Sequence, residues 1–216
     1  MSRGLGDVYK RQMLPLVSRL NRISVREPEA AGLIEKLTGN RPEVVVDPTI
    51  LAGKELFAPI VKSLHDRPYV LYYQLARKDN RALSLADKIA RYKNLDLVGL
   101  SGNRGLQIGK SHDVICDAGP EEFVSLIAGA DYVVTDSFHG TVFSLLFHRP
   151  FASIPKATRG GRITNLLDIA GLRNRYTDRF DRDILLKDID WGNVDNSLAR
   201  EREASEHFVT SIKGDF

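Results

Sequence analysis

The fold is decided by residues 130–147, which read ADYVVTDSFHGTVFSLLF. Residues 132–135 are apolar and mostly β-branched, which is typical of a strand buried on both faces of a parallel sheet. The residues after Gly140 are apolar at helical spacing. Between these parts the chain turns from the carboxyl end of a strand to the amino end of a helix. Open α/β sheets bind ligands at such turns.

The side chains of this turn predict an anion-binding site with one histidine. The N–H groups of a helix start favour an anion, and we expect Ser137, Gly140 and Thr141 to let a phosphate or carboxylate come close. His139 can hold a proton near neutral pH and deliver it. A simpler interpretation is that Ser137 or Asp136 caps the helix and that His139 is only a first-turn residue.

Strands and helices alternate along the rest of the chain. We expect strands at 22–27, 43–48, 69–73, 95–100, 113–116, 132–135 and 150–154. We expect helices at 29–37, 82–92, 120–127, 163–170 and 194–212, and a connecting stretch at 49–67 with a helical turn at 57–64. Such alternation predicts the α/β class, a doubly wound parallel sheet with right-handed crossovers.

The domain organisation follows from these elements. We expect a remnant of an N-terminal Rossmann-like domain at 13–66, a C-terminal Rossmann-like domain at 67–185 and a helical tail at 186–216. Residues 1–12 are set apart as an artefactual leader, because they have no hydrophobic period and 7–12 match the translated end of a transposon adapter used in sequencing libraries. The remnant needs more strands than it supplies, so we expect an exposed apolar edge and self-association.

The composition excludes several classes of protein. With 216 residues, 43% hydrophobic and 27% charged, the chain is that of an ordinary globular protein. It has no apolar run of transmembrane length and no secretory signal, so we expect no transmembrane segment and a cytoplasmic location. The single cysteine, Cys116, excludes an intramolecular disulfide, and no residues have the spacing of a zinc site. We therefore predict no metal and no cofactor.

The charge balance gives no indication of a nucleic-acid partner. The formal net charge is +3, and basic and acidic residues become nearly equal in number when residues 1–12 are set aside. We predict no nucleic acid among the partners.

A second group of candidate residues is the basic segment, residues 156–162, which read KATRGGR. It follows the strand after the His139 turn, so both belong to the same edge of the sheet. Lys156, Arg159 and Arg162 are expected to converge on a phosphate, with the glycines giving backbone access. The alternative is an ordinary solvated basic loop.

Arg26 is the third candidate. It lies at the end of an expected strand, and its guanidinium can bind a carboxylate through two parallel bonds. The alternative is a salt bridge to Glu27 or another neighbour. We interpret Asp47 as an Asx-type turn residue rather than a catalytic one.

Five stretches, taken together, resemble the polysaccharide pyruvyl transferase family. They are ISVRE at 23–27, VDPT at 46–49, GPEEF at 119–123, VTDSFHGT at 134–141 and RGGRITNLL at 159–167. The resemblance implies a glycosyltransferase-B-like architecture of two Rossmann-like domains with the active site between them. It implies transfer of a pyruvyl group from phosphoenolpyruvate to sugar hydroxyls of a cell-surface polysaccharide or exopolysaccharide, which forms a ketal.

The resemblance also assigns roles to the candidate residues. Arg26 matches the arginine of the family that follows a serine–valine pair, and His139 matches the motif histidine, which we expect to be the general acid. Which of Lys156, Arg159 and Arg162 takes the role of the cationic group of the family is left open. The implied partners are phosphoenolpyruvate as donor and a sugar or lipid-linked saccharide as acceptor.

Two other functions stay open. One is a nucleotide-sugar glycosyltransferase of the same architecture, in which the turn and the basic segment hold a diphosphate. The other is a non-catalytic module that binds an anion or a sugar. The family's complete N-terminal domain is expected to precede residue 13, so this chain is expected to be a fragment that is inactive alone.

Overall fold

The chain forms two compact units. The computed structural model describes residues 12, 14–75, 80–101, 113–156 and 160–213. Unit 1 comprises residues 1–51 and 199–216, and unit 2 comprises residues 52–198. The prediction for residues 1–12 falls almost wholly outside the described residues and stays a prediction.

Unit 2 contains a five-stranded parallel sheet. Its strands are β3 (Tyr69–Tyr73), β4 (Asp96–Leu100), β5 (Asp113–Ile115), β6 (Tyr132–Thr135) and β7 (Phe151–Ser153). They are arranged in the order β5-β4-β3-β6-β7, and every neighbouring pair is parallel. This is the strand order of a Rossmann-like sheet, in which the direction of winding reverses between the first and fourth strands. Here that switch point lies between β3 and β6.

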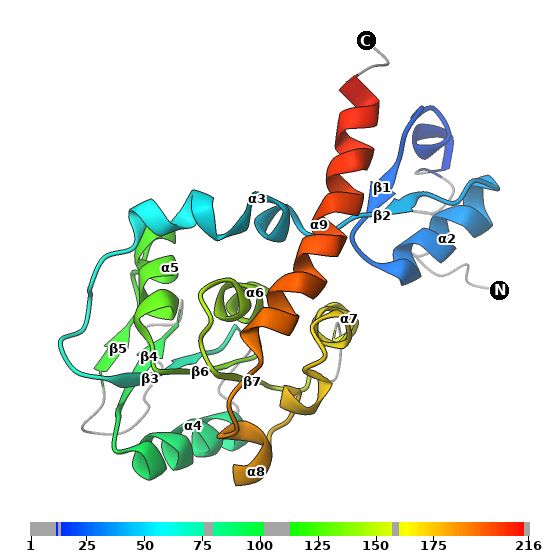
Figure 1. The fold of residues 1–216 in the computed structure, drawn as a ribbon. Coiled ribbons are helices and arrows are strands. Elements are labelled where there is room, and N and C mark those ends of the chain that lie inside the picture. The colour runs from blue at the N-terminus through cyan, green and yellow to red at the C-terminus, as the bar shows by residue number, and fades with distance from the viewer. Residues whose placement is uncertain (1–11, 13, 76–79, 102–112, 157–159, 214–216) are drawn as a thin grey trace. The chain divides into compact units, whose positions relative to one another are not determined.

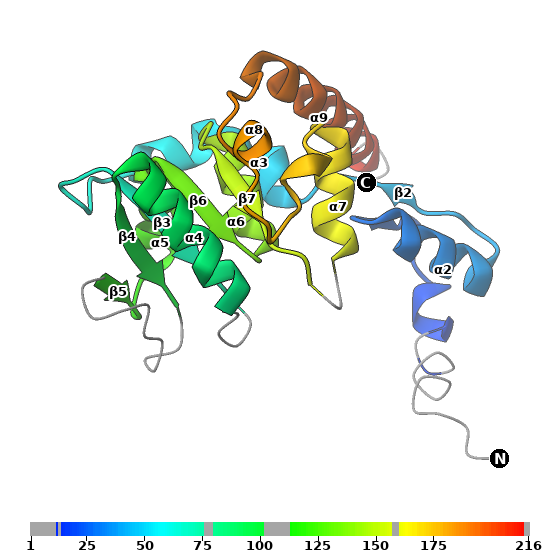
Figure 2. The ribbon, with the colours of Figure 1, turned by 90° about the horizontal axis from the view of Figure 1, so that it is seen from below.

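Helices cover both faces of this sheet, which confirms the predicted doubly wound α/β class (Figures 1 and 2). One face carries α4 (Asn80–Lys93) and the short α8 (Arg182–Leu185). The other carries α5 (Pro120–Gly129) and α6 (Phe138–Leu146). At the end of the sheet formed by β7, the chain adds α7 (Gly161–Ile169) and the 3-10 helix η2 (Arg173–Arg175).

The core of unit 2 follows the two-residue period of its strands. Alternate side chains of the central strands pack with Leu85 and Ile89 of α4; they are Val70, Tyr72, Tyr132, Val134, Ala152 and Ile154. The opposite face is aromatic, because Tyr73 contacts Phe123 of α5, and Phe123 contacts Phe143 of α6. Burial on both faces explains why these strands read as continuous apolar runs.

The prediction of a connecting stretch at 49–67 is wrong for its first part, because a helix occupies that part. The structure has α3 (Pro48–Phe57) followed by the 3-10 helix η1 (Ala58–Ile60). Pro48 suits a first helical position, and the Asp47 carboxylate accepts the Thr49 N–H at 3.0 Å. Gly53 interrupts the helix with φ 73°, a conformation that favours glycine. The division into units falls inside α3, at 51/52, rather than at the expected 66/67.

Unit 1 has a small parallel sheet of β1 (Ser24–Val25) and β2 (Glu43–Val44), joined by α2 (Pro28–Thr38). The long helix α9 (Trp191–Lys213) contributes its last part to this unit, where the Ser205 hydroxyl accepts the Val46 N–H at 3.0 Å. Val44 is 42% exposed and Leu33 49% exposed, in keeping with the expected exposed apolar edge. The expected self-association stays a prediction.

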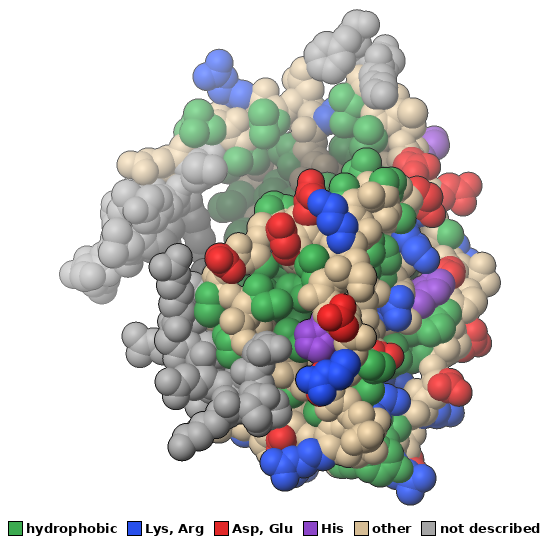
Figure 3. All heavy atoms as spheres, turned by 90° about the vertical axis from the view of Figure 1, so that its left-hand side faces the viewer, with side chains coloured by type: hydrophobic (Ala, Val, Ile, Leu, Met, Phe, Trp, Pro, Cys, Tyr) green, Lys and Arg blue, Asp and Glu red, His purple; other side chains and the backbone are tan. Residues whose placement is uncertain are grey.

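The surface shows no large patch of one charge on the face drawn in Figure 3, where the described acidic and basic side chains are interspersed. Among the described residues, none of the helices combines the length and the apolar character needed to cross a membrane.

Candidate functional site

The candidate site lies at the carboxyl ends of β3 and β6, at the switch point of the sheet. Tyr73 and Thr135, the last residues of these strands, are register partners. The chain continues from β3 into Gln74 and Leu75, and from β6 into the predicted turn. Because the connections diverge on opposite sides of this point, a crevice for ligands forms there in sheets of this type.

Ser137 is the N-cap of α6, as the simpler interpretation of the turn expects. Its hydroxyl accepts the Gly140 N–H at 3.2 Å, and its own N–H donates to Thr135 Oγ1 at 3.0 Å. The side chain of Ser137 is buried, with 2% of the residue exposed. Burial also raises the pKa of the neighbouring Tyr73 phenol, an effect partly offset by a hydrogen bond with Ser137. The Ser137 hydroxyl therefore stabilises the turn, because it is engaged in this cap.

Gly140 and Thr141 lie in the interior and not at the surface where an anion would approach. The Thr141 hydroxyl donates to Ser137 O at 3.1 Å and lies 2.7 Å from Ser153 Oγ of β7, and Thr141 is fully buried. Gly140 packs against Thr135, and its N–H is taken by the cap. The predicted direct contact of these two residues with substrate is therefore replaced by a structural role, because the third and fourth residues after the cap face the sheet.

Gly140→Ala is expected to lower the free energy of unfolding by about 2 kcal/mol. The added Cβ would lie 2.6 Å from Thr135 Oγ1 and 2.9 Å from Thr135 Cγ2, and Thr135 is held by the sheet and by Ser137. Urea denaturation measures the effect. The matched control is Gly32→Ala in α2, where a Cβ meets nothing within 4 Å; this change is expected to stabilise by about 0.5–1 kcal/mol. Equal effects of the two changes would contradict this packing.

His139 differs from its neighbours because it is exposed at the start of α6. Its ring contacts the edge of the Phe138 ring, with the ring centroids 5.4 Å apart. An exposed imidazole in the first turn of a helix can meet a bound anion and transfer a proton to it. The predicted catalytic residue is thus positioned for such a role.

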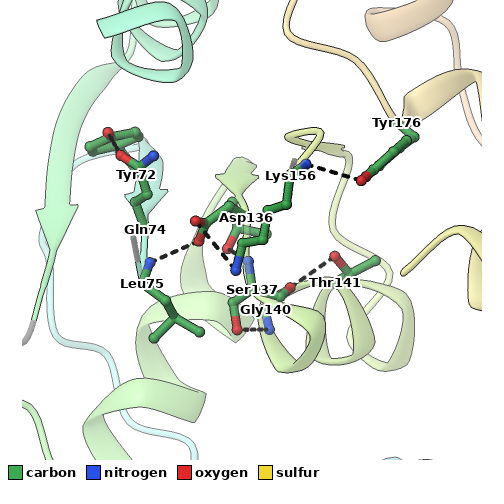
Figure 4. Close-up of polar contacts among 10 residues, drawn as sticks. Tyr72, Gln74, Leu75, Asp136, Ser137, Gly140, Thr141, Lys156 and Tyr176 are labelled. Atoms are coloured by element: carbon green, nitrogen blue, oxygen red, sulfur yellow. Dashed lines mark hydrogen bonds and ion pairs between the residues drawn. The ribbon is translucent and has the colours of Figure 1, made fainter. Parts of the chain in front are cut away.

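Asp136 connects three strand ends and was not among the predicted site residues. It is buried, with 2% exposed; its Oδ1 accepts the Leu75 N–H at 2.8 Å, and its Oδ2 lies 3.4 Å from Lys156 Nζ (Figure 4). A buried carboxylate requires such partners. The sequence offered one signal for this role, an aspartate directly after the four residues of a buried strand. It did not identify the partners, because Leu75 and Lys156 are distant from Asp136 in the chain.

Two cations of the basic segment reach the turn. Lys156 does so through Asp136, with 26% of its side chain exposed. The guanidinium of Arg162 lies over the Phe138 ring, 4.3 Å from the centroid. Arg159 lies outside the described residues. The prediction that the basic segment and the His139 turn share one edge of the sheet is confirmed for Lys156 and Arg162.

Arg26 belongs to unit 1, whereas the residues described above belong to unit 2. Its Nη1 donates to Asp47 Oδ2 at 2.5 Å, and Asp47 is 4% exposed. This pair is the alternative expected for Arg26, with Asp47 in place of Glu27. The turn role expected for Asp47 is confirmed by its bond from the Thr49 N–H.

Tyr176 is a further residue that sequence reasoning missed. Its hydroxyl accepts the Lys156 N–H at 3.1 Å. Twenty residues separate the two positions, and nothing in the local pattern relates them. Together, the described residues give the turn an exposed imidazole and two cations that contact it through Phe138 and Asp136, and these groups suit a phosphorylated or carboxylated substrate. They contain no group of three His, Cys, Asp or Glu side chains that could hold a metal ion.

Comparison with solved structures finds related folds at low sequence identity. AviGT4, a glycosyltransferase involved in avilamycin A biosynthesis, aligns with a TM-score of 0.50 at 11% identity over 88% of this chain and 62% of its own. UDP-GlcNAc 2-epimerase from Neisseria meningitidis gives 0.49 at 13% identity over 90% of this chain and 56% of its own. The E. coli heptosyltransferase WaaC gives 0.40 at 17% identity over 61% of this chain and 44% of its own. The chain thus spans about half the length of these proteins.

Comparison of sequences gives the family. No curated protein matches the chain. The family model for polysaccharide pyruvyl transferase matches residues 4–155, which include β3, β6, the His139 turn and β7. The match ends at the residue before Lys156. Because this match covers well over half of its length, the chain belongs to the polysaccharide pyruvyl transferase family.

Proposed function

We propose that the protein transfers a pyruvyl group from phosphoenolpyruvate to hydroxyl groups of a saccharide, forming a pyruvate ketal on a cell-surface polysaccharide or exopolysaccharide. The family is one of transferases, and the donor and acceptor are the proposed part. The observation that carries the proposal concerns the turn after β6: His139 and Arg162 both contact the Phe138 ring, and Lys156 pairs with the nearby Asp136.

The charges of this group match the donor. Phosphoenolpyruvate carries a phosphate and a carboxylate close together, so its site needs more than one cation and a helix start. The Lys156 ammonium and the Arg162 guanidinium come from the segment after β7, and the helix start is that of α6. Asp136 lies behind Lys156 and fixes the direction of its ammonium without being exposed to the ligand.

The reaction requires one proton donor and stabilisation of the departing phosphate. His139 protonates the methylene carbon of the donor, and the central carbon becomes oxocarbenium-like. One acceptor hydroxyl attacks that carbon, and its proton returns to the His139 imidazole. The C–O bond to phosphate breaks, and a second hydroxyl completes the ketal and releases its own proton. The products are the ketal and inorganic phosphate, which carries away the remaining proton. Lys156 and Arg162 stabilise the charge on the phosphate as it leaves.

The acceptor of the proposed reaction is a sugar or a lipid-linked saccharide. We place the reaction in the cytoplasm, because phosphoenolpyruvate is a metabolite of that compartment. A donor-binding role for Arg26 is proposed from the match to the family alone.

Calorimetric titration of the complete protein with phosphoenolpyruvate tests the proposal. We expect saturable binding that Arg162→Ala weakens by about 10- to 100-fold, because a hydrogen bond to a charged group contributes about 1.5–3 kcal/mol. The matched control is Arg91→Ala on α4, whose exposed side chain pairs with Asp87 within the same helix and should leave affinity unchanged.

The other outcomes separate the alternatives. Binding of a nucleotide diphosphate sugar in place of phosphoenolpyruvate would refute the proposal in favour of a glycosyltransferase. Binding of phosphoenolpyruvate without ketal formation on any saccharide offered would indicate a non-catalytic module.

A further inference from the structure

One tyrosine hydroxyl contacts both ends of the stretch between Lys156 and Gly160. Tyr176 accepts the Lys156 N–H at 3.1 Å (Figure 4). The same oxygen lies so close to Gly160 that any Cβ at that position would overlap it. Gly160 has φ −75°, a backbone conformation open to all residues. The need for glycine at this position is therefore steric and is set by the Tyr176 hydroxyl.

Tyr176 itself is held firmly by its surroundings. It forms a parallel bridge with Ser153, the last residue of β7, and the Thr177 N–H donates to Ser153 O at 2.9 Å. The preceding residue, Arg175, is 2% exposed and donates to the carbonyl oxygens of Phe151, Leu185 and Lys187 at 3.2, 3.2 and 2.6 Å. The hydroxyl is thus presented from a rigid support beside the sheet.

Lys156 is consequently held at two points. Its N–H is fixed by Tyr176, and its ammonium lies 3.4 Å from the buried Asp136 carboxylate. A flexible lysine side chain loses considerable conformational entropy when it binds an anion, and fixing its backbone beforehand reduces that loss. The location of the cation therefore depends on the Tyr176 hydroxyl, which bonds to the Lys156 backbone and not to its ammonium.

We propose that Tyr176 is a positioning residue of the donor site, whose hydroxyl holds Lys156 and Gly160 so that the Lys156 ammonium is ready for the anionic donor. This inference rests on the proposed function for the identity of the donor. The placement of Lys156 and Gly160 by the hydroxyl is independent of it.

A double-mutant cycle with Tyr176→Phe and Gly160→Ala tests the inference in the complete protein. Tyr176→Phe removes the acceptor, and we expect about fivefold weaker binding of phosphoenolpyruvate, the effect of one neutral hydrogen bond. Gly160→Ala alone should weaken binding at least as much. In the Tyr176→Phe background, Gly160→Ala should add little, because the next atoms, Lys156 O and Tyr176 Cζ, are 3.5 and 3.6 Å from the new Cβ. Acceptor KM should stay unchanged in all three variants.

Two further measurements separate positioning from a loss of stability. Tyr69→Phe removes a buried hydroxyl that donates to Leu126 O at 2.7 Å, at the start of β3, and should lower the melting temperature without changing donor affinity. Hydrogen exchange at the Lys156 amide should become several-fold faster in Tyr176→Phe, and this readout needs no ligand.

The outcomes are distinguishable. An unchanged exchange rate at Lys156 in Tyr176→Phe, or an equal effect of Gly160→Ala in both backgrounds, would overturn the inference. If the parent protein does not bind phosphoenolpyruvate, the proposed function fails, while faster exchange at Lys156 and coupled melting temperatures would still support the placement by Tyr176.

Discussion

Replacement of His139 by alanine is expected to lower kcat for ketal formation by about 10²–10⁴-fold, which is the usual contribution of a general acid. The imidazole is exposed at the start of α6, so its removal creates no cavity and leaves the cap of Ser137 intact. We therefore expect the melting temperature to stay close to that of the parent. Turnover is measured by release of inorganic phosphate from phosphoenolpyruvate in the presence of a saccharide acceptor.

The control for this change is His207→Ala, which removes another exposed imidazole, on α9. It should leave kcat within about twofold, because surface substitutions away from a site have small effects. A His139→Ala protein that turns over at a rate near that of the parent would exclude His139 as the general acid.

Asp136→Ala is expected to lower the free energy of unfolding by about 3 kcal/mol. The change leaves the Leu75 N–H without its acceptor and Lys156 without its buried counter-charge. Asp136→Asn should have a smaller effect, about 1–2 kcal/mol, because an amide oxygen can still accept the Leu75 N–H. Urea denaturation followed by circular dichroism measures both changes.

A comparison of variants tests whether the loss of stability comes from breaking the Asp136–Lys156 pair and not from removing the carboxylate alone. Lys156→Met leaves a carboxylate buried without its ammonium, so the double variant Asp136→Asn/Lys156→Met should be more stable than Lys156→Met. Asp87→Ala removes one partner of an exposed pair on α4 and should change stability by no more than about 0.5 kcal/mol. If Asp136→Ala unfolds at the same urea concentration as the parent, the connecting role of Asp136 is wrong.

Local patterns predicted the strands near the site well. β3 and β6 begin and end at the expected residues, because each is a short apolar run bounded by polar or turn-forming residues. The turn after β6 was also predicted, since the change from a strand pattern to a helical pattern leaves only one position for it. By contrast, α3 was missed, because Pro48 was interpreted as the end of a strand although proline also suits the start of a helix.

The candidate site was predicted in its chemistry and only in part in its geometry. His139, Lys156 and Arg162 were chosen because imidazole, ammonium and guanidinium groups near helix starts suit an anion. Gly140 and Thr141 were assigned to the same surface because they are small, whereas the helix turns both of them toward the sheet. The number of residues between the cap and each position decides which way that position faces. Which direction is the interior becomes clear only when the helix is placed against β6 and β7.

The sequence by itself determined the α/β class, the edge of the sheet at which cations and a histidine gather, and the family. These depend on residue type and on short-range period, which every segment carries within itself. Only the tertiary structure decided the partners: Asp136 with Leu75 across 61 residues, and Lys156 with Tyr176 across 20. Each of those groups can bond with many others, and the strand order selects among them, because it alone brings the ends of β3, β6 and β7 to one place.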